Sequence, residues 1–154
     1  MEILYLLNIG ILIGDIMIEI VLITHGSLGL ELLNTCEMIL GKQDNIQIIS
    51  ILNSSSLTEV ADRLDNIIAK YEKQGILIFT DMFGGSPSNI SMAYLRSGEI
   101  EVITGVNLPM LIKAFTLRRE SDSVEEISQK AAAGGKSSIR IARELLDYAD
   151  KNHI

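Results

Sequence analysis

The residues best suited to chemistry are a histidine, an aspartate and a short glycine-rich turn. His25 follows one apolar run, Asp81 follows another, and Gly84-Gly85-Ser86 comes soon after Asp81. A carboxylate bonded to one imidazole nitrogen fixes the ring tautomer and leaves the other nitrogen free as a nucleophile. Backbone N–H groups in a glycine-rich turn that opens a helix favour an anion. Together these residues predict a histidine that is transiently phosphorylated beside an anion-binding turn.

Each of these residues also has a plainer interpretation. A lone histidine after a strand is more often a loop residue than a catalyst. Ser86 followed by Pro87 is a good N-cap and first-turn pair, and Asp81 can close an Asx turn. Asn107 is interpreted as a turn or cap residue, with a role in a phosphate site as the alternative. The catalytic interpretation is favoured because these residues converge on one edge of the predicted sheet.

Four apolar, β-branched runs predict the strands that end at this edge. They are residues 18–23, residues 46–52, Ile76–Thr80 and Ile100–Thr104. The first run is apolar on both faces, which is typical of a central parallel strand. In open parallel sheets, chemistry gathers beyond the carboxyl ends of the strands. In the strand order 2-1-3-4 the first and third strands are neighbours, so His25 and Asp81 face each other across the topological switch point.

Helical periodicity predicts helices between and after these strands. Pro109 is expected to open one of these helices, and Gly134-Gly135 to end another. Two helices begin at a predicted capping box, Ser56 with Glu59 and Ser123 with Glu126. The expected helices are residues 27–41, residues 56–71, a short helix through residues 90–94, residues 110–117, and residues 123–135. Alternating strands and helices predict one α/β domain with a mainly parallel sheet flanked by helices. Residues 138–142 fit either a fifth strand or a further helix.

Composition narrows the class of protein. A chain of 154 residues that is 47% hydrophobic predicts one domain with a substantial core. The net charge of −7 argues against nucleic acid as a partner, because no basic stripe exists to neutralise phosphates. The single cysteine, Cys36, fits a reducing compartment, and its place on the apolar face of a predicted helix indicates a buried, unreactive thiol.

Several enzyme classes lack support in the motifs. The sequence has neither G-x-x-x-x-G-K-[ST] nor a G-x-G-x-x-G after a strand, so nucleotide binding is not indicated. Two distant histidines and one cysteine give no metal-ligand spacing, and no G-x-S-x-G elbow occurs. We therefore expect no metal and no other cofactor.

Residues 1–16 form an apolar leader before the first strand. Asp15 and Glu19 interrupt the apolar run, and acidic residues are costly at membrane depth. No Lys or Arg precedes Lys42, so the positive region of a signal peptide is missing. We expect a domain over residues 17–154, and our hypothesis is that Met17 is the biological start. Mass spectrometry of the natively expressed protein tests this, and an intact residue 1 would contradict it.

Three motifs resemble the IIA component of mannose-class sugar phosphotransferase systems. They are THG at residues 24–26, TDMFGGSPSN at residues 80–89 and TGVNLPML at residues 104–111, in the family's order and each at a predicted strand end. The resemblance implies a flavodoxin-like α/β domain in the cytoplasm that requires no metal or nucleotide. It also implies a homodimer that exchanges a C-terminal strand, for which residues 138–142 are the candidate.

The resemblance assigns roles to single residues as well. His25 matches the phosphorylated histidine, Asp81 the aspartate that orients it, and Gly84, Gly85 and Ser86 the loop that meets the phosphoryl group. The implied reaction is acceptance of a phosphoryl group from the carrier protein HPr and its transfer to a cognate IIB component. In the family, IIB phosphorylates sugar that enters through the membrane subunits IIC and IID.

Three other functions stay open at this point. The chain could be the related phosphoryl donor of dihydroxyacetone kinase, a regulatory module in which phosphorylated His25 alters a partner, or a purely structural binding module. Two apolar residues beside the predicted site, Met82 and Phe83, are either a contact patch for a transfer partner or part of the interior.

Overall fold

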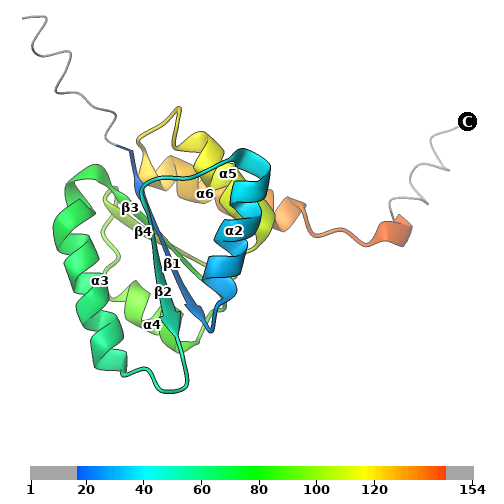
Figure 1. The fold of residues 1–154 in the computed structure, drawn as a ribbon. Helices are drawn as coiled ribbons and strands as arrows, with labels where there is room; N and C mark the ends of the chain where they lie inside the picture. The colour runs from blue at the N-terminus through cyan, green and yellow to red at the C-terminus, as the bar shows by residue number, and fades with distance from the viewer. Residues whose placement is uncertain (1–16, 145–154) are drawn as a thin grey trace, which may run out of the picture.

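Four parallel strands form the centre of the fold in the computed structural model, which describes residues 17–144. Their bounds are β1 (Glu19–His25), β2 (Ile46–Ile51), β3 (Ile76–Thr80) and β4 (Ile100–Thr104). They are ordered β2-β1-β3-β4, so the predicted order 2-1-3-4 is confirmed. The order puts β1 and β3 side by side in the middle of the sheet, with β2 and β4 on its two edges (Figure 1).

The strand register aligns the carboxyl ends of the strands with one another. Ile23 of β1 pairs with Thr80 of β3, and Thr80 pairs with Thr104 of β4. His25 extends β1 beyond this level and pairs with Ile51, the last residue of β2. All of β1 before His25 is buried, as the apolar run predicted for a central parallel strand.

Helices cover both faces of the sheet (Figure 1). They are α2 (Leu28–Leu40), α3 (Leu57–Tyr71) with the 3-10 turn η1 (Glu72–Gln74), α4 (Ser86–Met92), α5 (Leu108–Leu117) and α6 (Val124–Ser137). Helices α3 and α4 pack on one face, and α2, α5 and α6 pack on the other. The predicted α/β class with a parallel sheet between helices is therefore confirmed.

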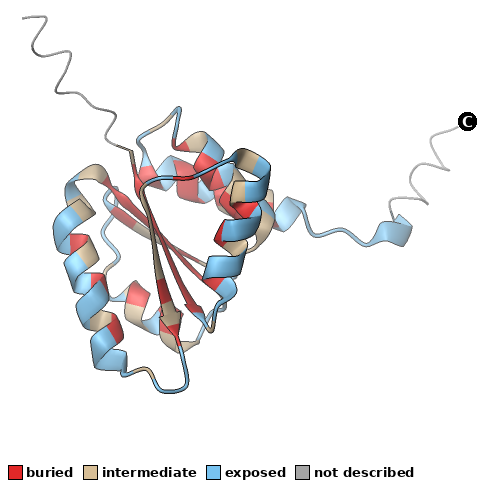
Figure 2. Ribbon diagram, viewed as in Figure 1, coloured by how far each residue is buried: buried red, intermediate tan, exposed pale blue. Residues whose placement is uncertain are grey.

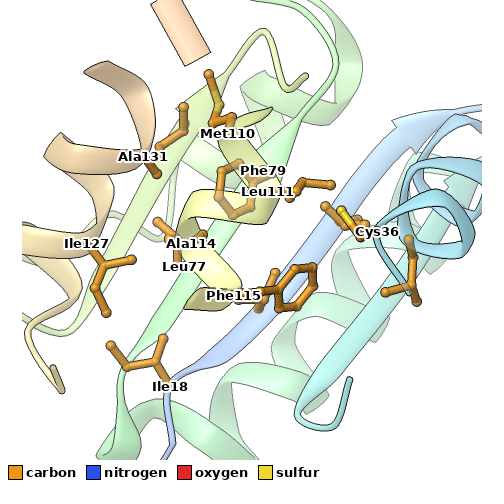
Figure 3. Close-up of a cluster of buried hydrophobic side chains, with 14 of the residues drawn as sticks. Ile18, Cys36, Leu77, Phe79, Met110, Leu111, Ala114, Phe115, Ile127 and Ala131 are labelled. Carbon is orange, nitrogen blue, oxygen red and sulfur yellow. The ribbon is translucent and has the colours of Figure 1, made fainter. Parts of the chain in front are cut away.

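The two layers of helices enclose two apolar cores, which appear as the buried inner sides of the helices in Figure 2. On the α3 side, alternate residues of the strands meet Val60, Leu64 and Ile68. On the other side, Figure 3 shows Leu77 and Phe79 of β3 beneath α5, between the inner faces of α2 and α6. Cys36 belongs to this second core and is fully buried, as expected.

Helix ends differ from the sequence predictions at several points. One half of the predicted capping box forms at α6, where Ser123 accepts the Glu126 amide hydrogen, but the Ser123 amide donates to the Ser121 hydroxyl and not to the Glu126 carboxylate. Ser56 makes no capping bond at α3. The N-cap of α4 is Gly85, and the predicted cap Ser86 is its first helical residue.

Helix α6 also continues through Gly134-Gly135 to Ser137, although these glycines were predicted to end it. The reason is close packing against α5. A Cβ on Gly135 would lie 2.6 Å from the Met110 Cε and 3.0 Å from the Asn107 Oδ1. The absent side chain here permits a helix crossing, so the glycine does not break the helix.

After α6 the described chain runs away from the sheet (Figure 1). Residues 138–142 form no strand within the described part of the chain, and Ile139 and Ile141 are largely exposed. None of the helices within residues 17–144 is long and apolar enough to cross a membrane. Residues 142–144 are helical, while the rest of the helical alternative, through Leu145 and Leu146, and the leader of residues 1–16 lie outside the described residues.

Candidate active site

His25 and Asp81 meet at the carboxyl ends of the two central strands. The His25 Nδ1 lies 2.8 Å from the Asp81 Oδ2, and the backbone amide of His25 donates to the same oxygen at 2.8 Å. The facing arrangement that the strand order predicted is therefore present. One carboxylate oxygen fixes both the backbone and the ring of the histidine.

Local structure just before and after His25 places the ring at the edge. Thr24 is buried, and its Oγ1 accepts the amide hydrogen of Gly29 at 2.8 Å, which ties the first turn of α2 to the end of β1. Gly26 has a φ of +57°, which favours glycine, and its amide donates to the Ile51 carbonyl. The chain therefore turns sharply after His25 and leaves the imidazole above the sheet.

The hydrogen bonds to Asp81 determine its charge and the tautomer of His25. Partial burial alone would raise the pKa of Asp81, but the bonds from the His25 amide, the His25 ring and the Met82 amide outweigh it and lower the pKa. An ionised carboxylate only accepts hydrogen bonds, so the proton on the ring belongs on Nδ1. The Nε2 atom then carries the lone pair.

The two side chains differ in their access to solvent. The side chain of Asp81 is 11% exposed, whereas that of His25 is 49% exposed. The charge that orients the ring is therefore shielded, and the ring itself can be reached from outside. Such a pair can present a nucleophilic nitrogen to a second macromolecule.

The glycine-rich turn approaches the imidazole at Gly85. A Cβ on this residue would lie 3.2 Å from the His25 Cε1, so the backbone of Gly85 packs directly against the ring. Gly84, with a φ of +82°, makes the turn possible. The structure thus brings together His25, Asp81 and Gly85, and Ser86 follows as the first residue of α4.

The turn contains one connection that the sequence did not predict. The Ser88 Oγ accepts the amide hydrogen of Gly84 at 3.0 Å and donates to the carbonyl of Gly85 at 3.0 Å. The Gly84 amide is therefore occupied, whereas the amides of Gly85 and Ser86 donate to no other described residue. A serine that follows a Gly-Gly-Ser-Pro turn was the available signal, because serine hydroxyls bond readily to nearby backbone.

The loop after β4 completes the edge. The amides of Gly105 and Val106 both donate to the Thr80 carbonyl at 3.0 Å, directly before Asp81. Asn107 caps α5 by accepting the Met110 amide hydrogen, and its side-chain nitrogen donates to the Gly135 carbonyl. The interpretation of Asn107 as a cap residue is confirmed.

Apolar side chains lie exposed beside the pair. Met82 is 56% exposed and Phe83 is 73% exposed, so the alternative that both pack inward is wrong. Within residues 17–144, no group of three His, Cys, Asp or Glu residues could hold a metal ion. The site therefore consists of an oriented histidine, a glycine-rich turn and an apolar margin.

Comparison with known proteins places this arrangement in a family. The family model EIIA-man, described as PTS system fructose IIA component, matches residues 19–132. The PTS system mannose-specific EIIAB component of Escherichia coli (strain K12) is 33% identical over 125 residues, which are 80% of this chain and 39% of that protein. The PTS system fructose-specific EIIA component of Bacillus subtilis (strain 168) is 23% identical over 133 residues, which are 85% of this chain and 90% of that protein.

The fold leads to the same family. The crystal structure of phosphotransferase system component EIIA from Streptococcus agalactiae superposes with a TM-score of 0.75 and 28% identity, covering 81% of this chain and 97% of that chain. The family match includes β1, β3 and the turn between Asp81 and α4. The chain therefore belongs to the EIIA-man family, the mannose-class IIA phosphoryl-transfer components of the sugar phosphotransferase system.

Proposed function

We propose that His25 is the residue that carries the phosphoryl group. Its Nε2 attacks the phosphorus of phosphorylated HPr, the N–P bond to HPr breaks, and a new N–P bond forms on His25. The 2.8 Å contact between Nδ1 and the Asp81 Oδ2 carries this proposal. It keeps the proton on Nδ1 while Nε2 reacts, and it sets a negative charge beside the imidazolium that forms. The second transfer, to a cognate IIB component, repeats the step in reverse.

The proposal gives the glycine-rich turn a role in binding the phosphoryl group. Gly85 adjoins the ring, and the amides of Gly85 and Ser86 donate to no acceptor within residues 17–144, so both can donate to a phosphoryl group on His25. The group passes between two proteins, each of which must dock over the same strand edge. The exposed Met82 and Phe83 supply the apolar part of such a docking surface.

HPr and IIB work in the cytoplasm, and we propose that this chain works there too.

We also propose a homodimer that exchanges residues 138–142. Ile139 and Ile141 are two residues apart, so in an extended chain both point to the same face. They are 74% and 62% exposed, and the segment leaves its own domain (Figure 1). Beyond Ile100, β4 has no strand on its outer side within residues 17–144. A strand from a second copy would cover that edge and bury both isoleucines.

Labelling with phosphoenolpyruvate tests the phosphoryl transfer. The purified full-length chain is incubated with labelled phosphoenolpyruvate, Enzyme I and HPr, and then with the cognate IIB component. We expect label on the wild-type chain, complete loss in His25→Ala, and passage of the label to IIB. His153 is the internal control, because His153→Ala should be labelled like the wild type.

The outcomes separate the functions left open by the sequence. An unchanged label in His25→Ala would refute the assignment of His25. Label that stays on His25 and never reaches IIB would favour the regulatory module. Label that passes to dihydroxyacetone kinase instead would favour that donor function.

A further inference from the structure

Ser88 connects the glycine-rich turn to helix α4 through both halves of its hydroxyl group. The oxygen accepts from the Gly84 amide and the hydrogen goes to the Gly85 carbonyl, each at 3.0 Å. The residue is fully buried, so water does not compete for either bond. The hydroxyl therefore fixes the backbone on both sides of the Gly84–Gly85 peptide bond.

Gly85 is the residue of the turn that packs against His25. The ring atom nearest Gly85 is Cε1, which is bonded to both Nδ1 and Nε2. Asp81 holds the ring through Nδ1, and Gly85 meets it at the neighbouring carbon. The orientation of Nε2 therefore depends on two supports, of which only the aspartate is a side chain.

We infer that Ser88 is a positioning residue for phosphoryl transfer at His25. It acts through the Gly85 backbone, which it holds in place beside the edge of the imidazole, next to the attacking nitrogen. Without the hydroxyl, the turn at Gly84 loses its internal bonds and Gly85 can withdraw from the ring. The ring then keeps its bond to Asp81 but gains freedom to tilt, and the reaction slows because fewer encounters have the required geometry. The effect on rate rests on the proposed function of His25.

The chain offers a matched control on the same helix. Ser91 is also fully buried in α4, and its Oγ donates to the Pro87 carbonyl at 2.7 Å. Ser91→Ala therefore removes a buried hydroxyl and a backbone bond of the same kind, without touching the glycine-rich turn. Ser88→Cys is an intermediate variant, because a thiol has similar shape but forms weak hydrogen bonds.

The first measurement follows the ring itself and needs no phosphorylation. The chain has two histidines, so the NMR signals of the Cε1–H groups are easily assigned. We expect the His25 signal to shift and broaden in Ser88→Ala, to change less in Ser88→Cys, and to stay in place in Ser91→Ala. The signal of His153 should stay in place in all three variants.

The second measurement is the rate of phosphorylation, with phospho-HPr and with phosphoramidate as donors. With phosphoramidate the donor N–P bond breaks, ammonia leaves and the Nε2–P bond forms, so docking of a protein partner plays no part. We expect Ser88→Ala to react about three- to tenfold more slowly with both donors, which is the effect expected of one or two neutral hydrogen bonds. Ser91→Ala should match the wild type at a temperature where all variants are folded.

The results distinguish this inference from the proposed function. If Ser88→Ala behaves like Ser91→Ala in both the ring signal and the rate, the positioning role is wrong. If both serine variants slow the reaction in proportion to their loss of thermal stability, the effect is structural and the inference also fails. A wild-type chain that neither donor labels at His25 would overturn the proposed function, while the ring signal would still decide whether Ser88 positions the imidazole.

Discussion

One carboxylate organises the histidine that we propose as the carrier of the phosphoryl group. Asp81 accepts from both the backbone and the ring of His25, so the position of the residue and the orientation of its side chain depend on the same oxygen. Its remaining oxygen, Oδ1, accepts the Met82 amide hydrogen, which holds the carboxylate itself in place. Replacing Asp81 therefore changes the tautomer preference of the ring without removing the nucleophile.

The first prediction concerns this hydrogen bond. In Asp81→Asn we expect phosphorylation of His25 by phospho-HPr to slow by about 10- to 100-fold, the rate equivalent of a charge-assisted hydrogen bond of ~1.5–3 kcal/mol. Single-turnover transfer rates provide the measurement. Asp65→Asn is the control, since it neutralises a carboxylate that accepts a 2.8 Å hydrogen bond from the Tyr94 hydroxyl elsewhere on the surface. Equal rates in the two variants would contradict the role of Asp81.

A second carboxylate, at the other end of the sheet, affects stability. Glu19 is fully buried, and although Gln47 donates to its Oε1, the Oε2 has no partner among residues 17–144. Burial raises its pKa, and the weaker effects of Gln47, Arg118 and Lys70 do not compensate. For a carboxyl group with a raised folded-state pKa, stability is greatest below the unfolded value of about 4.3 and declines as pH rises through the folded value.

We therefore predict that Glu19→Gln stabilises the protein near neutral pH. The variant should raise Tm at pH 7.5 by about 2–5 °C, and the difference should vanish at pH 4, where the wild-type carboxyl is protonated. Thermal unfolding at the two pH values measures this. Glu72→Gln, which removes the charge of an exposed ion-pair partner of Arg96, should leave Tm nearly unchanged. If Glu19→Gln has a lower Tm than the wild type at pH 7.5, the negative charge of Glu19 stabilises the fold and the prediction is wrong.

At the scale of secondary-structure elements, Arg118 ties the end of α5 to the beginnings of two strands. Its guanidinium donates to the carbonyls of Ile18, Asp44 and Asn45 and lies over the ring of Phe115. The residue is buried, and burial lowers its pKa to about 10. A planar group with several fixed donors can serve three carbonyls at once, which a lysine ammonium cannot do with the same geometry.

Arg118→Lys is thus expected to cost about 1–3 kcal/mol of unfolding free energy, because buried carbonyls lose their donors. Denaturant titration of both proteins gives this number. The matched substitution is Arg63→Lys, where an exposed arginine donates to the Ile48 carbonyl of the edge strand. Arg63→Lys should change the unfolding free energy by no more than about 0.5 kcal/mol. Similar losses in both variants would mean that the burial of Arg118 contributes nothing.

The elements also show how much of the fold the sequence contains. The strands were predictable because runs such as Ile76–Thr80 are apolar enough to be buried on both faces, and this need is local. The end of α6 was not, because Gly134-Gly135 break a helix only where no neighbour requires the space. The two hydrogen bonds of Ser88 were not predicted either, because the position of a serine after such a turn indicates a bond to nearby backbone but does not say which backbone groups it will reach.

At the scale of the whole molecule, the described chain leaves apolar surface that its own fold does not cover. Ile139 and Ile141 are largely exposed, and within residues 17–144 no strand pairs with the outer side of β4 beyond Ile100. Isolated exposed apolar residues are common, and Met38 on α2, at 86% exposure, is an example. The pair after α6 differs because its spacing fits one face of a strand and an unpaired strand edge lies in the same fold.

This difference gives the last prediction. A double variant, Ile139→Glu with Ile141→Glu, places two charges on the face that the exchanged strand would bury, so we expect the proposed dimer to dissociate into monomers. Met38→Glu adds a charge to an exposed apolar position outside the exchanged segment and should leave the dimer intact. Light scattering coupled to size-exclusion chromatography measures the mass of each protein. A wild-type chain that elutes as a monomer, or a double variant that remains dimeric, would refute the exchange.

Since His25 and Asp81 come from β1 and the end of β3 in one chain, the monomeric double variant should still accept label from phospho-HPr.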